Sequence, residues 1–114
     1  FLKRSTSKND RLSESRGFYE HKNLKIDFAK NYLILNEKEK SLTEKETKIL
    51  AILTSNTSRI VERNEILIHV WGDDDYFIGR SLDVFISKIR KYISGSSCNI
   101  KNSHGVGFIW EEID

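Results

Sequence analysis

Residues 80–93 read RSLDVFISKIRKYI and carry the clearest helical pattern in the chain. At about 100° per residue, one face collects aliphatic side chains within roughly 40° of one another, and we expect it to lie in the core. Its members are Leu82, Ile86, Ile89 and Ile93, with Phe85 and Tyr92 on one shoulder. The members of the opposite face are Arg80, Val84, Ser87, Lys88 and Lys91. Solubility does not explain an apolar Val84 among cations, so this face is a candidate binding surface.

Two further helices are predicted upstream of this stretch. Thr43 followed three residues later by Glu46 is a capping box, which predicts a helix that begins there and ends near Asn56. A second helix is indicated by four apolar residues at helical spacing, Ile66, Leu67, Val70 and Trp71. Gly72 ends this helix, and residues 59–61 before it are short and extended.

The remaining segments predict strands. Short apolar groups at residues 18–19, 24–28 and 32–35 and a polar run into Leu42 alternate with turns, which is typical of a small antiparallel meander of about four short strands. Gly95-Ser96-Ser97 ends the third helix, and residues 99–102 and 108–111 form a hairpin with two glycines at its bend. A meander, three helices and a terminal hairpin make an α+β plan, a winged helix-turn-helix whose hairpin is the wing.

Composition narrows the class of protein. A length of 114 residues with 38% hydrophobic residues suits one domain with a modest core. Cys98 is the single cysteine, which excludes an internal disulfide and a zinc knuckle. No stretch approaches the roughly 18 uncharged apolar residues that a membrane span needs. We therefore expect a soluble, cytoplasmic domain with no membrane partner.

Charge is segregated along the chain. Residues 76–104 hold five basic residues and one acidic residue, whereas residues 62–75 hold one basic and five acidic residues. A basic stretch beside an acidic one favours a polyanionic partner for one face. A solvated helix face is the plainer alternative for Lys88, Arg90 and Lys91 taken alone. The exposed Val84 and the wing favour DNA, because a valine can meet a thymine methyl group and cations attract phosphates.

Three short motifs suggest other chemistry, and their context argues against it. Asp73-Asp74-Asp75 lacks the alternate spacing of a calcium loop. Ser103-His104 has no nucleophile-elbow context, and Gly105-Val106-Gly107 precedes a strand, with Trp110 where a dinucleotide fingerprint needs its third glycine. We expect no enzymatic activity, no cofactor and no metal.

Four motifs in order carry a family resemblance: Leu42–Glu46 (LTEKE), Val70–Gly72 (VWG), Arg80–Lys91 and His104–Phe108 (HGVGF). From about residue 17 to the end, the chain resembles the OmpR/PhoB-type winged-helix output domain of two-component response regulators. The resemblance implies a sequence-specific double-stranded DNA-binding transcription regulator in a phosphorelay, with the third helix in the major groove and the wing in the minor groove. It also implies an upstream receiver domain with its cognate sensor kinase, and residues 1–16 as the linker to it.

The resemblance assigns roles to single positions. It implies base reading by Asp83, Val84, Ser87 and Lys88, and phosphate binding by Arg80, Phe85, Arg90 and Lys91. It places Asn102 and His104 of the wing at the minor groove and Asp73, Asp74 and Asp75 in a loop that contacts RNA polymerase. It further implies a dimer on tandem half-sites of promoter DNA.

The chain departs from the family pattern at four of these positions. Arginine is common in the family at the position of Ser87 or Lys88. A polar residue is usual at the position of Phe85. Several members have an arginine in the wing where this chain has His104. The operator should therefore differ from those of well-known members. The alternative to DNA binding is a winged-helix protein-interaction module whose basic face docks an acidic partner.

Overall fold

A computed structural model describes residues 17–72, 76–103 and 105–113. Its elements follow the predicted order, and the α+β winged helix-turn-helix is confirmed. The bounds are β1 (Phe18–His21), β2 (Leu24–Asp27), β3 (Tyr32–Leu35), β4 (Lys38–Ser41), α1 (Glu44–Thr54), β5 (Ile60–Glu62), α2 (Arg63–Trp71), α3 (Tyr76–Tyr92), β6 (Cys98–Ser103) and β7 (Gly107–Glu112). Within the described ranges, no helix is both long and apolar enough to cross a membrane.

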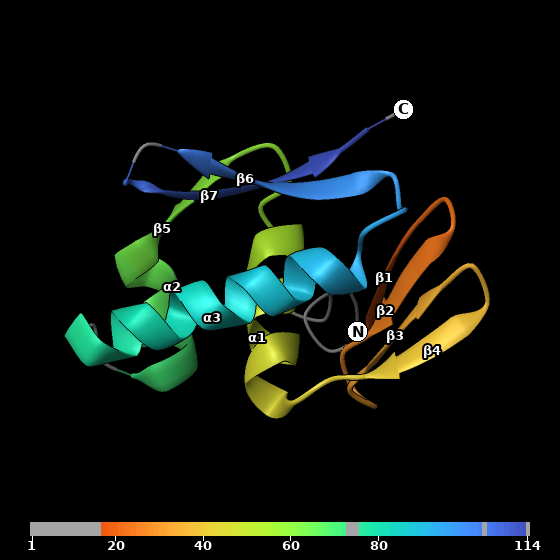
Figure 1. The fold of residues 1–114 in the computed structure, drawn as a ribbon, viewed down its shortest axis with the longest axis horizontal. Coiled ribbons are helices and arrows are strands. Elements are labelled where there is room, and N and C mark those ends of the chain that lie inside the picture. The colour runs from red at the N-terminus through yellow and green to blue at the C-terminus, as the bar shows by residue number, and fades with distance from the viewer. Residues whose placement is uncertain (1–16, 73–75, 104, 114) are drawn as a thin grey trace, which may run out of the picture.

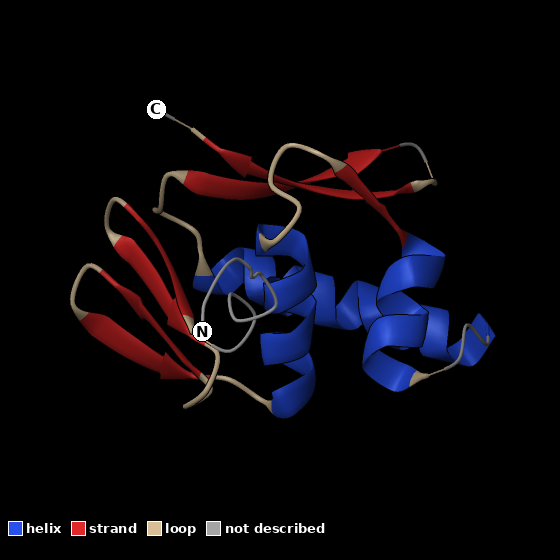
Figure 2. Cartoon of the chain, turned by 180° about the vertical axis from the view of Figure 1, so that it is seen from behind, coloured by secondary structure: helices blue, strands red, loops and turns tan. Residues whose placement is uncertain are grey.

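Two antiparallel sheets lie on different sides of the three helices (Figure 1). The meander β1–β4 pairs in chain order and stands at one end of the molecule. The second sheet has the order β5-β7-β6 and covers the helices, as the reverse view in Figure 2 also shows. The helix α3 runs along the molecule below this second sheet. This arrangement leaves the side of α3 that faces away from the core open to solvent.

The predicted inner face of α3 is buried. Leu82, Ile86, Ile89 and Ile93 are each no more than 2% exposed and join one cluster with residues of α1, α2 and both sheets. Val84 is 55% exposed, as the pattern predicts for the outer face. The tryptophans differ from each other: Trp110 is fully buried, whereas Trp71 is only partly buried.

The predicted capping box at the start of α1 is confirmed. The Thr43 N–H donates to Glu46 Oε1 at 2.8 Å, and the Glu46 N–H donates to Thr43 Oγ1 at 3.2 Å. The buried Glu46 also accepts a hydrogen bond from the Tyr92 hydroxyl at 3.0 Å, which ties the start of α1 to the end of α3. The helix ends at Thr54, slightly before the predicted Asn56, and the left-handed residue that follows is Ser58, with φ 67°.

A tyrosine–tryptophan contact joins the two sheets. The Trp110 Nε1–H donates to the Tyr19 hydroxyl at 3.0 Å, and the two rings meet edge to face with centroids 5.6 Å apart. The Tyr19 hydroxyl in turn donates to the carboxylate of Glu112 and lies 3.6 Å from the Cys98 sulfur. Because Tyr19 belongs to β1 and the other three to β6 and β7, this cluster docks the meander on the base of the wing.

One expectation about the hairpin bend is wrong. Gly105, with φ 76°, lies at the bend, but Gly107 is the first residue of β7 and pairs with Ser103 and Glu62. A Cβ on Gly107 would lie 2.8 Å from the Glu62 Cα and still closer to the Val61 carbonyl oxygen. Gly107 is therefore needed because β5 approaches β7 closely. The extended segment predicted at residues 59–61 is this strand β5, shifted by one residue.

The two glycines should respond differently to alanine. Gly107→Ala should lower the free energy of unfolding by about 3 kcal/mol or more, because its methyl group collides with the backbone of β5. Gly105→Ala has open space and meets only the left-handed backbone penalty, about 1 kcal/mol. Urea denaturation of both variants measures the difference, and equal losses would show that β5 and β7 are not this close.

Stability should fall at alkaline pH through Tyr19. Burial, and then the hydrogen bond to Glu112, raise the pKa of the Tyr19 phenol above its ordinary value. As pH rises above about 10, the unfolded chain releases this proton while the folded chain keeps it, so the free energy of unfolding declines. Urea denaturation from pH 8 to 11 should show a shallower decline for Tyr19→Phe, with Tyr32→Phe as the control. An unchanged slope in Tyr19→Phe would assign the loss to other groups.

Candidate nucleic-acid interface

The outer face of α3 brings most of the predicted base and phosphate positions together. One helix carries them in the structure, and Arg80, Asp83, Val84, Ser87, Lys88 and Lys91 are exposed. Spacings of three and four residues place Arg80, Val84, Ser87 and Lys91 on one side of the helix. The result is an exposed surface with cations around a central valine.

Asp83 is engaged by an ion pair. Arg63, the first residue of α2, places Nη1 at 2.7 Å from Asp83 Oδ1 and donates from Nη2 to the Gly79 carbonyl oxygen at 3.0 Å. The Asp83 side chain is 61% exposed and that of Arg63 is 29% exposed, so this pair sits at the edge of the surface. The position that the resemblance assigns to base reading thus has a partner within the protein.

Arg63 also contacts the wing, and sequence reasoning missed it. Its backbone N–H donates to the Val106 carbonyl oxygen at 3.1 Å, and its guanidinium lies 5.8 Å from the centroid of the Phe108 ring. Arg63 therefore connects the start of α2, the first half of α3 and the hairpin. The sequence feature that could have identified Arg63 is that it is the single lysine or arginine in the acidic stretch 62–75.

Arg90 and Asn102, predicted to bind phosphate and the minor groove, contact each other. The Arg90 Nη2–H donates to Asn102 Oδ1 at 2.6 Å, and its Nε–H donates to the Ile100 carbonyl oxygen at 3.1 Å. Arg90 is partly buried, whereas Asn102 is exposed. This arginine thus joins the second half of α3 to the wing strand β6.

Phe85 has a packing partner that extends the basic surface. Its ring packs against Trp71 with centroids 5.7 Å apart, and Lys88 Nζ lies 5.8 Å from its centroid. Lys45 Nζ lies 5.5 Å from the Trp71 ring, so a lysine from the start of α1 joins the two aromatic residues. Sequence reasoning did not select Lys45, because only the fold brings α1 next to the end of α2.

The remaining predicted positions are described only in part. His104 and the acidic residues Asp73, Asp74 and Asp75 lie outside the described residues. Lys101 is exposed on β6, which is an edge strand of its sheet. Near the bend of the wing, Asn102 and Val106 are exposed and Ser103 is half-buried.

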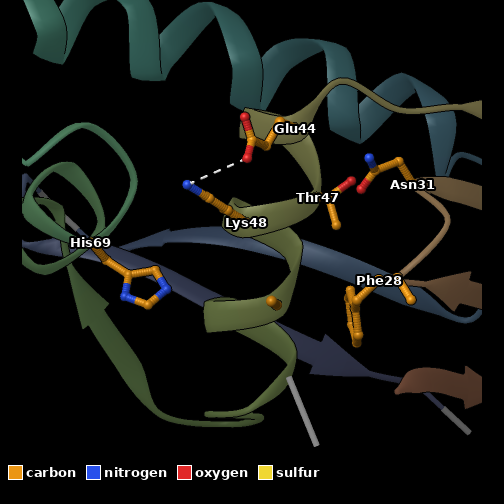
Figure 3. Close-up of a pocket in the computed structure, with 8 residues that line it drawn as sticks. Phe28, Asn31, Glu44, Thr47, Lys48 and His69 are labelled. Carbon is orange, nitrogen blue, oxygen red and sulfur yellow. Dashed lines mark ion pairs between the residues drawn. The ribbon is translucent and has the colours of Figure 1, made fainter. Parts of the chain in front are cut away.

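A pocket of about 520 Å³ lies elsewhere, between α1, the turn after β2 and α2 (Figure 3). His69 borders it on the α2 side and Phe28 on the meander side, and Lys48 pairs with Glu44 at 3.8 Å. The lining residues are Phe28, Ala29, Asn31, Glu44, Thr47, Lys48, Ala51 and His69. Among the described residues, no group of three His, Cys, Asp or Glu side chains is placed to hold a metal ion.

The geometry agrees with comparisons to known proteins. The family described as "Transcriptional regulatory protein, C terminal" matches residues 37–110. The chain belongs to this family. The transcriptional regulatory protein RprY of Bacteroides fragilis is 38% identical over 84 residues, which cover 73% of this chain and 36% of RprY. VxrB of Vibrio cholerae is 34% identical over 86 residues, 75% of this chain and 34% of VxrB. The chain thus spans about a third of these relatives.

Solved structures place this family member among winged-helix domains. The DNA-binding domain of CpxR from E. coli aligns with a TM-score of 0.74 at 18% identity, over 85% of this chain and 98% of that one. DrrB of Thermotoga maritima, an OmpR/PhoB homologue, aligns with a TM-score of 0.65 at 28% identity, over 83% of this chain and 44% of that one. The chain is an OmpR/PhoB-type DNA-binding domain of a transcription regulator, and the resemblance in its sequence is confirmed.

Removing Arg63 should destabilise the domain more than removing Asp83. Arg63→Ala should lower the free energy of unfolding by about 1–3 kcal/mol, because the Gly79 carbonyl and the Phe108 ring lose a partner as well. Asp83→Asn should cost less than about 1 kcal/mol, since the carboxylate is mostly exposed, and salt should reduce this cost. Urea denaturation at two salt concentrations measures both.

Arg59→Ala is the matched control for this prediction. Arg59 is exposed and donates to Asn56 Oδ1 at 3.0 Å, so its removal should change the free energy of unfolding by less than about 0.5 kcal/mol. If Arg63→Ala lowered the free energy of unfolding no more than Arg59→Ala does, the contacts of Arg63 to α3 and the wing would not stabilise the domain in solution.

Proposed function

We propose that this domain reads a specific double-stranded DNA site in promoters by placing α3 in the major groove and the β6–β7 wing in the neighbouring minor groove. The observation that carries the proposal is the outer face of α3, where an exposed valine stands among cations while the inner face is buried. A protruding helix of this kind fits the width of the major groove. Neutralising phosphates on both sides of the groove supplies the sequence-independent part of the affinity.

The outer face suggests a role for each side chain. Val84 is suited to a thymine methyl group, and Ser87 and Lys88 carry donors for base edges. Arg80 and Lys91 flank them along the same side of the helix and suit phosphates. A lysine lacks the two parallel donors of an arginine, so Lys88 should discriminate guanine less sharply than an arginine would. Lys45 extends the phosphate-binding surface to the start of α1.

The domain would act within a longer protein. We propose that residues 1–16 link it to an upstream receiver domain that a cognate sensor kinase phosphorylates. Two domains would then bind tandem half-sites about 10 base pairs apart, on the same side of the duplex. Asp73, Asp74 and Asp75 are proposed to contact RNA polymerase after DNA is bound, and His104 to enter the minor groove.

Selection of bound duplexes from a random pool tests the proposal, followed by affinity measurements at several salt concentrations. A site preference that survives excess nonspecific DNA, with log affinity falling linearly in log salt, supports it. The alternative is a basic face that docks an acidic protein. It would be favoured if the selection enriched no sequence and excess nonspecific DNA abolished binding.

Two lysines of α3 should differ in their effects on this site. Lys88→Ala should cost about 1–3 kcal/mol on the best site and relax the preference at one base pair. Lys91→Ala should weaken binding to all sequences alike and reduce the salt slope by about one. Lys30→Ala, which removes an exposed lysine from the turn after β2, is the control for charge alone. Equal losses on all sequences for Lys88→Ala would contradict base reading by this residue.

A further inference from the structure

The contact between Arg90 and β6 lies where the core ends. Successive side chains of a strand alternate between its faces, so Cys98, Ile100 and Asn102 share one face of β6. Cys98 and Ile100 are buried in the core, but Asn102 lies beyond it and is exposed. The hydrogen bonds of Arg90 therefore hold β6 at the point where hydrophobic packing ends, just before the bend of the wing.

The geometry of the guanidinium suits this place. Its Nε–H reaches a backbone carbonyl, that of Ile100, and its Nη2–H reaches the side chain of Asn102 on the same strand. The strand β6 is at the edge of its sheet, so carbonyl groups on its outer side have no ladder partner. A planar fork donates these two bonds from two nitrogens at fixed positions, whereas a lysine donates all of its hydrogen bonds from one nitrogen.

We propose that Arg90 is a positioning residue that sets the angle between α3 and the wing, so that the two elements enter neighbouring grooves at a fixed spacing. This inference rests on the proposed function, and it gives Arg90 a role other than the phosphate contact that the family resemblance implies. The bonds to Ile100 and Asn102 hold the partly buried guanidinium against β6. Lys88 and Lys91 are exposed nearby and carry charge that suits phosphates.

Arg63 holds the other end of the same assembly. It connects Gly79 and Asp83 near the start of α3 with Phe108 and Val106 of the hairpin. Among the described residues, Arg63 and Arg90 thus bind the wing to α3 by polar contacts, and Arg90 does so beside the strand β6. Loss of Arg90 should loosen the wing without unfolding it.

The test compares Arg90→Lys and Asn102→Ala with the double variant, and Lys91→Ala is the control. In the free chain, amide relaxation by NMR should show larger wing motion at Ser103 and Val106 in Arg90→Lys and Asn102→Ala, but not in Lys91→Ala. Thermal unfolding checks that each variant is folded. Asn102 is exposed, so its variant keeps the test open if Arg90→Lys does not fold.

The second readout is binding to duplexes with the selected core and either A·T or G·C base pairs under the wing. Arg90→Lys should reduce the preference between flanks by about fivefold or more, while the preference in the core and the salt slope stay as in the unaltered protein. The double variant should lose no more than Arg90→Lys alone, because both changes break one contact.

Other outcomes overturn the inference or the proposed function separately. Unchanged wing motion in Arg90→Lys and Asn102→Ala would overturn the positioning role whether or not DNA binds. A salt slope reduced by about one in Arg90→Ala, with flank preference intact, would overturn it in favour of a phosphate contact. If the unaltered protein shows no sequence preference while the wing loosens as expected, the proposed function fails and the bracing of the wing by Arg90 stands.

Discussion

The helix α3 can bury only one of its faces, and the rest of the domain is built around that face. Each aliphatic side chain removed from water stabilises the fold by roughly 1.5–3 kcal/mol, so rotating Leu82, Ile86 and Ile89 outward would remove a large part of the roughly 5–15 kcal/mol by which such a domain is stable. The opposite face is therefore presented to solvent as a fixed surface. A reading helix needs this property, because its side chains must keep one orientation toward a groove.

Hydrophobic burial orients α3 and the base of the wing, and polar and steric contacts contribute more toward the wing tip. The base of the wing is held by Trp110 against Tyr19, where two aromatic rings and a hydrogen bond connect the two sheets. Farther out, Gly107 lets β5 approach β7 closely. Near the bend the core ends, and single arginine contacts take its place. Toward its tip, the wing is thus held by weaker, individual contacts, each of which can be removed without the others.

Local patterns in the sequence predict the elements well because their causes are local. The Thr43–Glu46 capping box and the apolar period of α3 act within a few residues. The pairing of β5 with β7 has no local signal, and Gly107 was misassigned to the bend because two neighbouring glycines suggest a turn. Its real cause is the backbone of Val61, which only the folded chain brings near. The contact of Arg63 with Asp83, 20 residues away, is hidden for the same reason.

Counting basic residues in and around α3 treats them all alike, and the structure separates two pairs of them. Arg63 and Arg90 are partly buried and use their forked donors on carbonyl and side-chain oxygens of the protein. Lys88 and Lys91 stay exposed, where a flexible ammonium group can follow a phosphate. A tally of basic residues therefore overstates the charge available to DNA and hides the part that sets geometry. Under the proposed function, affinity and the relative placement of helix and wing depend on different cations, so that each can change without the other.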